Sequence, residues 1–193
     1  MTAFEKELAK EFERVVTDQL DSLYRTALRL LGNAEDAEDA VQECCARAYR
    51  GLGGFKPGSA LKPWLFRILK NICIDRLRWR SRVRHVSIDD DACKLDVEAK
   101  STGETPEGDC IRSSLGRTID RALSQLTVEQ RTVVVLVLIE GFTYAEAAVA
   151  LEVAEGTIRS RLNRARSRLR EALSSRDDVA ELWVSSSRPR LVM

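Results

Sequence analysis

The spacing of apolar residues predicts a helical protein. Up to Leu31, apolar side chains recur at intervals of three or four residues, as at Phe12, Val16 and Leu20, which is the period of an amphipathic helix. Gly32 and Asn33 then form a helix-ending turn signal, and Asn33 can cap a following helix. The same period predicts two further helices over residues 34–52 and 62–85.

A second group of helices is marked by its caps. Thr127 and Gln130, and again Thr143 and Glu146, have the spacing of a capping box, in which two side chains satisfy the free N–H groups of a helix start. Gly141 separates the two helices that begin at these boxes. The fold class predicted from both groups is all-α, with two small helical domains.

The second group ends in a helix-turn-helix pattern. The helix that follows Thr143 covers residues 144–151, and a long basic helix covers residues 155–173. Only Glu152, Val153 and Ala154 lie between them. A short helix, a tight turn and a longer helix are typical of a DNA-binding helix-turn-helix, whose second helix enters the major groove.

The two helix groups are separated by a polar segment. Residues 87–112 have no helical period, are rich in acidic side chains, and contain Ser, Thr, Gly and Pro, which predicts a flexible acidic linker. We therefore place one domain at residues 1–86 and the other at 113–174, followed by a C-terminal tail at 175–193.

Charge is strongly segregated along the chain, although the formal net charge of the 193 residues is only +1. Basic residues far outnumber acidic ones over 62–85 and 159–170, whereas acidic residues dominate over 87–109. A merely solvated helix would more often alternate charges. Trp79 among the arginines of 62–85 adds an aromatic ring, so this helix is predicted to contact nucleic acid.

The long basic helix has three distinct faces. An apolar stripe faces the domain core at Ile158, Leu162, Ala165, Leu169 and Leu173. The opposite face carries the small polar residues Ser160, Asn163 and Ser167, and the two flanks carry Arg159, Arg166 and Arg170 on one side and Arg161, Arg164 and Arg168 on the other. Small polar residues on the face toward the bases, the floor of the groove, and long cationic side chains on both flanks suit a helix that lies between the phosphates of a DNA groove.

The helix over 34–52 has an acidic face opposite its apolar one. Its polar side carries Glu35, Asp39, Gln42 and Glu43, flanked by Asp36 and Glu38. One interpretation is a solvated face whose acids also favour the helix dipole. The other is a docking face for a basic protein partner, and the residues alone leave both open.

Cysteine and histidine usage argues against a metal site. The five cysteines form no C-x-x-C pair, and the single histidine, His85, leaves a zinc site without its usual ligand spacing. The odd count indicates free thiols. Three lie in helical apolar patterns and are expected to pack in the core, namely Cys44, Cys45 and Cys73; the other two, Cys93 and Cys110, lie in the polar segment, where oxidants could reach them.

Other function classes find little support in the sequence. No nucleophile and base or metal-binding carboxylates form a recognisable catalytic set, so we expect no enzyme activity, no catalytic residue and no cofactor. There is no signal-peptide pattern and no apolar run of about 18 residues. We therefore expect a cytoplasmic protein with no membrane insertion.

Three motifs in series resemble a known family. GNAEDAEDAVQE, WLFRILKNICIDRLRWR and GFTYAEAAVALEVAEGTIRSRLNRARSRLREAL, in this order, are similar to the extracytoplasmic-function (ECF) sigma factors, compact bacterial proteins that keep sigma regions 2 and 4. The resemblance covers nearly the whole chain apart from the acidic linker and the tail after Ser174. It implies a region 2 helical bundle and a region 4 helix-turn-helix, and a sigma factor that binds core RNA polymerase and directs promoter-specific initiation.

The resemblance also implies roles for region 2 residues. The acidic helix would dock on the clamp helices of the polymerase beta-prime subunit through Asp36, Asp39, Gln42 and Glu43. The loop and basic helix after it would capture the minus-10 element as a melted nontemplate strand, with a base flipped near residues 55–61. The implied minus-10 contacts are Phe55, Lys56, Leu61, Arg67, Lys70, Asn71, Arg76, Arg78 and Arg80.

Region 4 would read the minus-35 duplex while touching the polymerase beta flap. The implied contacts are Thr157, Arg159, Ser160, Arg161, Asn163, Arg164, Arg166 and Arg168. Family members often have glycine where Glu152 stands, a capping serine where Ala154 stands, and an aromatic residue where Leu61 stands. An anti-sigma factor commonly holds such proteins inactive and is an expected partner here.

One alternative function explains part of the pattern. A stand-alone helix-turn-helix transcription regulator would account for residues 113–174. Such a regulator would usually pair that domain with a sensor or dimerisation domain, and not with an acidic helix and a second basic helix. Tight binding of duplex promoter without polymerase would favour the regulator.

Overall fold

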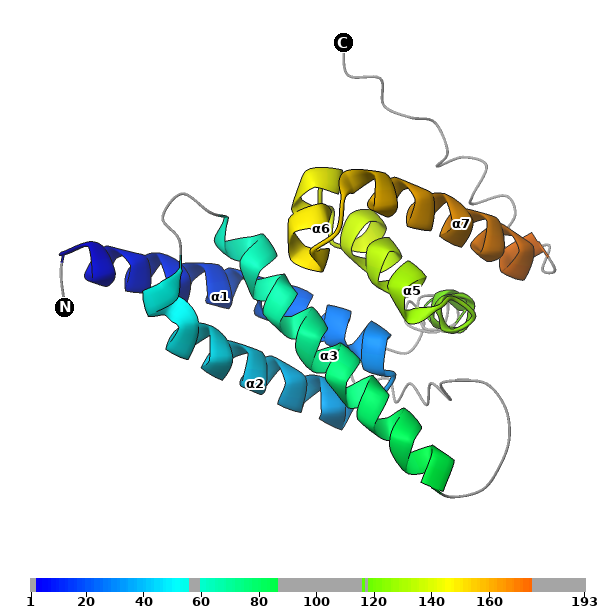
Figure 1. Cartoon of the computed structure of the whole chain (residues 1–193), viewed down its shortest axis with the longest axis horizontal. Coiled ribbons are helices and arrows are strands. Elements are labelled where there is room, and N and C mark those ends of the chain that lie inside the picture. The colour runs from blue at the N-terminus through cyan, green and yellow to red at the C-terminus, as the bar shows by residue number, and fades with distance from the viewer. Residues whose placement is uncertain (1–2, 56–59, 87–115, 117, 175–193) are drawn as a thin grey trace, which may run out of the picture.

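The computed structural model describes residues 3–55, 60–86, 116 and 118–174, and every regular element among them is helical. The predicted all-α fold is therefore confirmed for this part of the chain. The predicted linker and tail lie outside the described residues, as do Lys56, Cys93 and Cys110. Two groups of helices lie against each other in Figure 1, one from each side of the predicted linker.

The first group is a bundle of three helices, and the turn between the first two forms as predicted. The helices are α1 (Ala3–Leu31), α2 (Ala34–Gly51) and α3 (Leu61–Val86), with a 3₁₀ turn, η1 (Leu52–Gly54), after α2. Gly32 has a φ of 72°, a left-handed conformation that glycine adopts without a Cβ clash. The Asn33 side chain accepts a hydrogen bond from the backbone N–H of Asp36 at 3.2 Å, so Asn33 caps α2.

The apolar faces of these helices meet in one core. Side chains from all three helices are 0 or 1% exposed: Leu23 and Leu30 from α1, Ala40 and Cys44 from α2, and Leu65 and Leu69 from α3. Most of the buried positions of α2 are small, because Ala37, Ala40, Cys44 and Ala48 form its inner face. Small side chains let the α2 backbone approach α1 and α3 closely, which leaves the acidic side of α2 outside.

Two of the helical cysteines are buried in this core, as predicted. Cys44 and Cys73 are 0% exposed, whereas Cys45 is only half-buried, and all three are free thiols. Cys44 also donates a weak hydrogen bond from Sγ to the carbonyl of Leu65 at 3.5 Å. Burial raises the pKa of all three thiols, that of Cys73 to about 12.

These thiols should therefore be protected from alkylation in the native protein. Because the thiolate is the reacting form, we expect iodoacetamide near neutral pH to label Cys44 and Cys73 at least about 100-fold more slowly than in the urea-unfolded chain. Mass spectrometry of the proteolysed protein measures both rates. Equal native and unfolded rates at either cysteine would contradict the packing described above.

The second group contains the predicted helix-turn-helix. Its elements are a helical stretch over residues 118–124, α5 (Val128–Val134), the π-helical turn η2 (Val135–Ile139), α6 (Tyr144–Leu151) and α7 (Glu155–Ser174). Both predicted capping boxes are present, from Thr127 to Gln130 and from Thr143 to Glu146. Hydrogen bonds from the backbone and side chain of Thr143 lower the pKa of Glu146 from 4.5. The ionised Glu146 carboxylate therefore stabilises the fold fully above about pH 4.5, and this contribution is lost as the pH falls through the lowered pKa.

The apolar run before Gly141 is helical, but its geometry changes before it ends. The N–H of Glu140 donates to the carbonyl of Val135 at 2.9 Å, a π-type hydrogen bond that spans five residues. Gly141 then has a φ of 70° and ends the helix, as predicted. Leu138 and Ile139, within this π-helical turn, are 42% and 37% exposed, whereas Val135 and Leu136 before them are buried.

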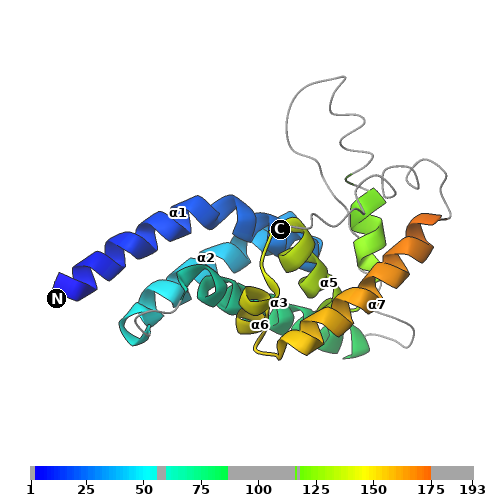
Figure 2. The ribbon, with the colours of Figure 1, turned by 90° about the horizontal axis from the view of Figure 1, so that it is seen from above.

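Polar contacts join the second group to α1. Arg131, 2% exposed, donates to the carbonyl of Leu30 at 3.5 Å. The carboxylate of Glu140 accepts a hydrogen bond from the hydroxyl of Ser22 and lies 3.6 Å from a guanidinium nitrogen of Arg25. In Figure 2 the C-terminal part of α1 lies beside α5, while its N-terminal end extends away from the second group.

Candidate nucleic-acid and protein interfaces

The basic helix α7 has the three faces that the sequence predicted. Its apolar stripe is buried, with Ile158, Leu162, Ala165, Leu169 and Leu173 each between 0 and 9% exposed. The opposite face is exposed at Ser160, Asn163 and Ser167, and so are Arg159, Arg164 and Arg166; Thr157 and Arg161 are half-buried. The hydroxyl of Ser160 donates to the carbonyl of Thr157, and that of Ser167 donates to the carbonyl of Asn163. Both serine side chains therefore stay close to their own helix.

One flanking arginine of α7 also has a contact within its own domain. Arg168 donates to the side-chain oxygen of Gln130 at 3.2 Å, and Gln130 in turn completes the capping box at the start of α5. This hydrogen bond holds the Arg168 guanidinium beside α5. Arg159 and Arg164, nearer the start of α7, are exposed to solvent.

The turn between α6 and α7 carries a strained residue. Glu152 follows α6 with φ 56° and ψ 43°, the left-handed conformation that glycine adopts at lower cost. Its N–H donates to the carbonyl of Val149 at 3.4 Å, and the next N–H, of Val153, reaches Ala148 at 3.1 Å. Ala154, which has no side-chain acceptor, accepts only through its backbone carbonyl from Thr157 and Ile158.

The same glutamate joins the helix-turn-helix to the basic helix α3. A carboxylate oxygen of Glu152 lies 3.5 Å from Arg67 and the other lies 3.6 Å from Lys70. Nearby, the rings of Phe66 and Phe142 pack edge to face with centroids 4.9 Å apart. Two of the predicted minus-10 residues are therefore paired with the second helix group, Lys70 with a side chain 12% exposed and Arg67 with one 39% exposed.

The other predicted minus-10 residues that the structure describes are exposed, buried or paired with α2. Asn71 and Arg78 are exposed, and Arg78 is 3.9 Å from Asp75 in a pair whose side chains are 74% and 67% exposed. Phe55 and Leu61 are buried, at 8% and 6% exposed. Phe55 packs against Trp64 with ring centroids 5.1 Å apart. The structure thus places Phe55 and Leu61 in the core, and residues 56–59 between them lie outside the described residues.

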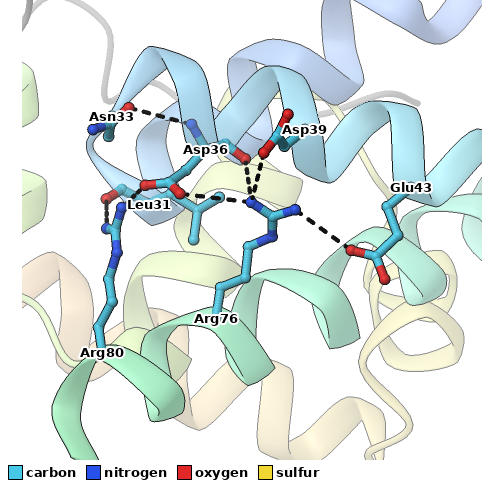
Figure 3. Close-up of polar contacts among 7 residues, drawn as sticks. All are labelled: Leu31, Asn33, Asp36, Asp39, Glu43, Arg76 and Arg80. Carbon is cyan, nitrogen blue, oxygen red and sulfur yellow. Dashed lines mark hydrogen bonds and ion pairs between the residues drawn. The ribbon is translucent and has the colours of Figure 1, made fainter. Parts of the chain in front are cut away.

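The remaining two predicted minus-10 residues meet the predicted docking helix. Figure 3 shows Arg76 of α3 directed at three carboxylates of α2, and Arg80 directed at the start of that helix. The nitrogen atoms of Arg76 lie 3.5 Å from Asp36, 3.6 Å from Asp39 and 3.5 Å from Glu43. Sequence reasoning assigned these residues to two separate surfaces, and the structure brings them together.

The four predicted docking residues differ in solvent exposure and in ion pairing. The side chain of Asp36 is 27% exposed and is paired with both Arg76 and Arg80, whereas that of Asp39 is 60% exposed. Gln42 is exposed, and Glu43 is half-buried between Arg76 and Arg47. The outward part of the acidic face is therefore centred on Asp39 and Gln42.

Comparisons with known proteins give the family. The family profile described as Sigma-70 region 2 matches residues 15–83, and the profile described as Sigma-70, region 4 matches residues 116–169. The chain therefore belongs to the Sigma-70 family, with region 2 in the first helix group and region 4 in the second. Among its relatives it belongs with the ECF RNA polymerase sigma factors, as the sequence motifs predicted.

The relatives cover most of the chain. It is 37% identical over 163 residues to the ECF RNA polymerase sigma factor SigE of Mycolicibacterium smegmatis, covering 84% of this chain and 62% of the relative. It is 37% identical over 166 residues to SigM of Mycobacterium tuberculosis, covering 83% and 79% of the two chains. The sigma factor RpoE of Bartonella quintana, solved with the anti-sigma factor NepR, is similar in structure, with a TM-score of 0.66, 30% identity, and coverage of 86% of this chain and 98% of that one.

Metal-binding clusters and membrane-spanning helices are features of other protein classes. In the ranges 3–55, 60–86, 116 and 118–174, no three His, Cys, Asp or Glu side chains form a group that could hold a metal ion. None of the helices described there is long and apolar enough to cross a membrane.

Sequence reasoning missed the contacts that join the two helix groups. Glu152 was recognised as unusual for its turn, but nothing in the sequence gave its partners on α3. The sequence patterns did not point to Arg131, whose burial depends on packing that includes a contact with Leu30, 101 positions earlier. The signal that could have found Arg131 is its position as a charged residue at the start of an apolar run, which the structure buries from Gln130 to Leu136.

Proposed function

We propose that this sigma factor docks on core RNA polymerase through the outward acidic face of α2, and recognises promoter DNA with α3 and α7. The observation that carries the proposal is the exposed side of α7, where small polar residues lie between two rows of arginine. In this assignment residues 1–86 form region 2, 87–112 the linker, 113–174 region 4 and 175–193 the tail.

The docking step relies on charge and exposure. Asp39 and Gln42 point outward from α2, and the inner face of the helix is anchored in the core by alanines and Cys44. A rigid helix with outward carboxylates suits the basic surface that the beta-prime clamp helices would present. The beta flap would contact region 4.

The minus-10 step requires the two helix groups to move apart. Asn71 and Arg78 are exposed and available to DNA, but Arg67 and Lys70 are paired with Glu152. We propose that binding to polymerase separates region 4 from α3 and frees these cations for the melted nontemplate strand. Lys56 would complete the site, with the buried side chains of Phe55 and Leu61 supporting it from the core.

The minus-35 step predicts a selective effect of Arg164→Ala. Arg164 is exposed near the floor residue Asn163, so its loss should weaken minus-35 recognition by about 1 to 3 kcal/mol and leave affinity for core polymerase unchanged. Competition between promoter fragments for the holoenzyme, with wild-type and altered minus-35 sequences, measures this loss. Undiminished preference for the wild-type minus-35 sequence would remove Arg164 from the reading surface.

The family suggests one more partner and a cellular setting. Because the Bartonella relative was solved with an anti-sigma factor, we propose that such a protein also restrains this chain. We further propose that the chain acts in the cytoplasm and has no catalytic activity of its own.

The test of the proposed function is transcription in vitro. Sigma-free bacterial core polymerase is supplied with a library of promoter fragments, with and without this protein. Transcripts that start at defined sites only when the protein is present would support the proposal and reveal both promoter elements. Absence of such transcripts with active core, together with tight binding of duplex DNA by the protein alone, would favour the stand-alone regulator.

A further inference from the structure

Arg76 contacts the acidic residues of α2, the helix proposed above to dock on core polymerase. Besides its three carboxylate neighbours, its guanidinium donates to the backbone carbonyl of Asp36 at 3.5 Å. Its side chain is 26% exposed, so most of its surface is covered by other parts of the protein. Figure 3 shows the guanidinium between Asp36, Asp39 and Glu43, and not directed away from α2.

Without a cation, these carboxylates would repel one another. Asp36 and Asp39 are three residues apart on α2, and Asp39 and Glu43 are four apart, which are the spacings at which like charges on a helix destabilise it. A guanidinium offers five N–H donors in a planar fork, so one arginine can bind several carboxylates at once. Arg76 therefore sets the positions of the acidic side chains.

Arg80 has a different role, because it ties α3 to the start of α2 and the end of α1. It pairs with Asp36 and donates to the carbonyl of Leu31 at 3.1 Å. That carbonyl is at the C-terminal end of α1, where backbone acceptors lack partners within the helix. Asp36 is thus held from two sides, and of these two arginines it is Arg76 that lies within ion-pair distance of the more exposed Asp39.

We propose that Arg76 is a positioning residue for polymerase docking and not a DNA contact. It binds the inward side of the acidic array and holds Asp39 and Glu43 in the geometry that the partner meets. This inference rests on the proposed docking of α2 and assigns Arg76, by its contacts, to the polymerase side of region 2.

The first test compares affinities for core polymerase. Fluorescence anisotropy of the full chain, labelled at its N-terminus and titrated with core, should give about tenfold weaker binding for Arg76→Gln. Arg76→Lys should recover part of the loss, because lysine keeps the charge but cannot bridge three carboxylates. Arg82→Gln removes the same charge from an exposed position of α3 and is the matched control, expected to bind core like the natural chain.

A double-mutant cycle separates positioning from a general loss of stability. If Arg76 acts through Asp39, Arg76→Gln should cost clearly less in an Asp39→Asn background than in the natural chain, whereas independent effects would add. The reduced promoter opening by Arg76→Gln should also be restored by raising the core concentration.

Three outcomes would overturn the inference. The first is unchanged core affinity with lost promoter opening at saturating core, which would make Arg76 a DNA contact. The second is additive losses in the cycle, which would indicate a role independent of Asp39. Absence of core binding by the natural chain would instead reject the proposed function, and this inference with it.

Discussion

Replacement of Arg131 by methionine is expected to lower the free energy of unfolding by about 3 to 5 kcal/mol. The guanidinium is buried and donates to the carbonyls of Leu123 at 2.9 Å, Ser124 at 3.1 Å and Leu126 at 3.3 Å, and to that of Leu30 across the two helix groups. A hydrogen bond from a charged donor contributes about 1.5 to 3 kcal/mol, and several bonds from one group do not add fully. Methionine has a similar length but donates no hydrogen bond, so each of these carbonyls loses the bond that Arg131 supplies.

Urea denaturation followed by circular dichroism measures this effect. Arg121→Met is the matched control, since Arg121 is exposed on the neighbouring helical stretch and its replacement should change stability by less than about 0.5 kcal/mol. Equal unfolding midpoints for Arg131→Met and the control would mean that the buried guanidinium is not important for the fold.

Local signals predicted the local structure. The turn at Gly32 and Asn33, and the capping boxes at Thr127 and Thr143, depend on residues no more than three or four positions apart, and all of them form. The apolar stripe of α7 was also predictable, because a helix that buries one face must repeat apolar residues at its own period.

Contacts between distant segments were not predictable from these patterns. Helical periodicity shows that Arg76 lies off the apolar stripe of α3, but it does not show which neighbouring helix that side meets. The acidic residues of α2 are 33 to 40 positions earlier in the sequence, and only the crossing of the two helices brings them to the guanidinium. A basic helix therefore looked like one DNA-facing surface, although Arg76 and Arg80 contact the protein itself.

Glu152 illustrates a local conflict that only the tertiary structure explains. A left-handed residue other than glycine costs roughly 1 to 2 kcal/mol, so the sequence alone suggests a poor turn. In the folded chain its carboxylate lies near Arg67 and Lys70 of α3. Glycine at this position would relieve the backbone cost and lose both ion pairs, so the residue contributes to the contact between region 2 and region 4.

Reversing the charge of Asp39 is expected to weaken binding to core polymerase about 100-fold or more. Asp39→Arg places a cation at the most exposed carboxylate of the docking array and next to Arg76, so it repels both a basic partner and its own neighbour. Like charges brought together in an interface cost several kcal/mol, and each 1.4 kcal/mol is about tenfold in affinity. The same anisotropy titration measures the loss, and the thermal unfolding midpoint shows whether the fold is kept.

The control for this variant is Glu38→Arg, which reverses a charge at the adjacent exposed position of the same helix. It changes the net charge equally, so any general electrostatic effect on association is shared by both variants. If docking depends on Asp39 itself, Glu38→Arg should lose far less affinity. Similar losses for the two would assign docking to overall charge, and full affinity of a folded Asp39→Arg protein would move the polymerase contact away from α2.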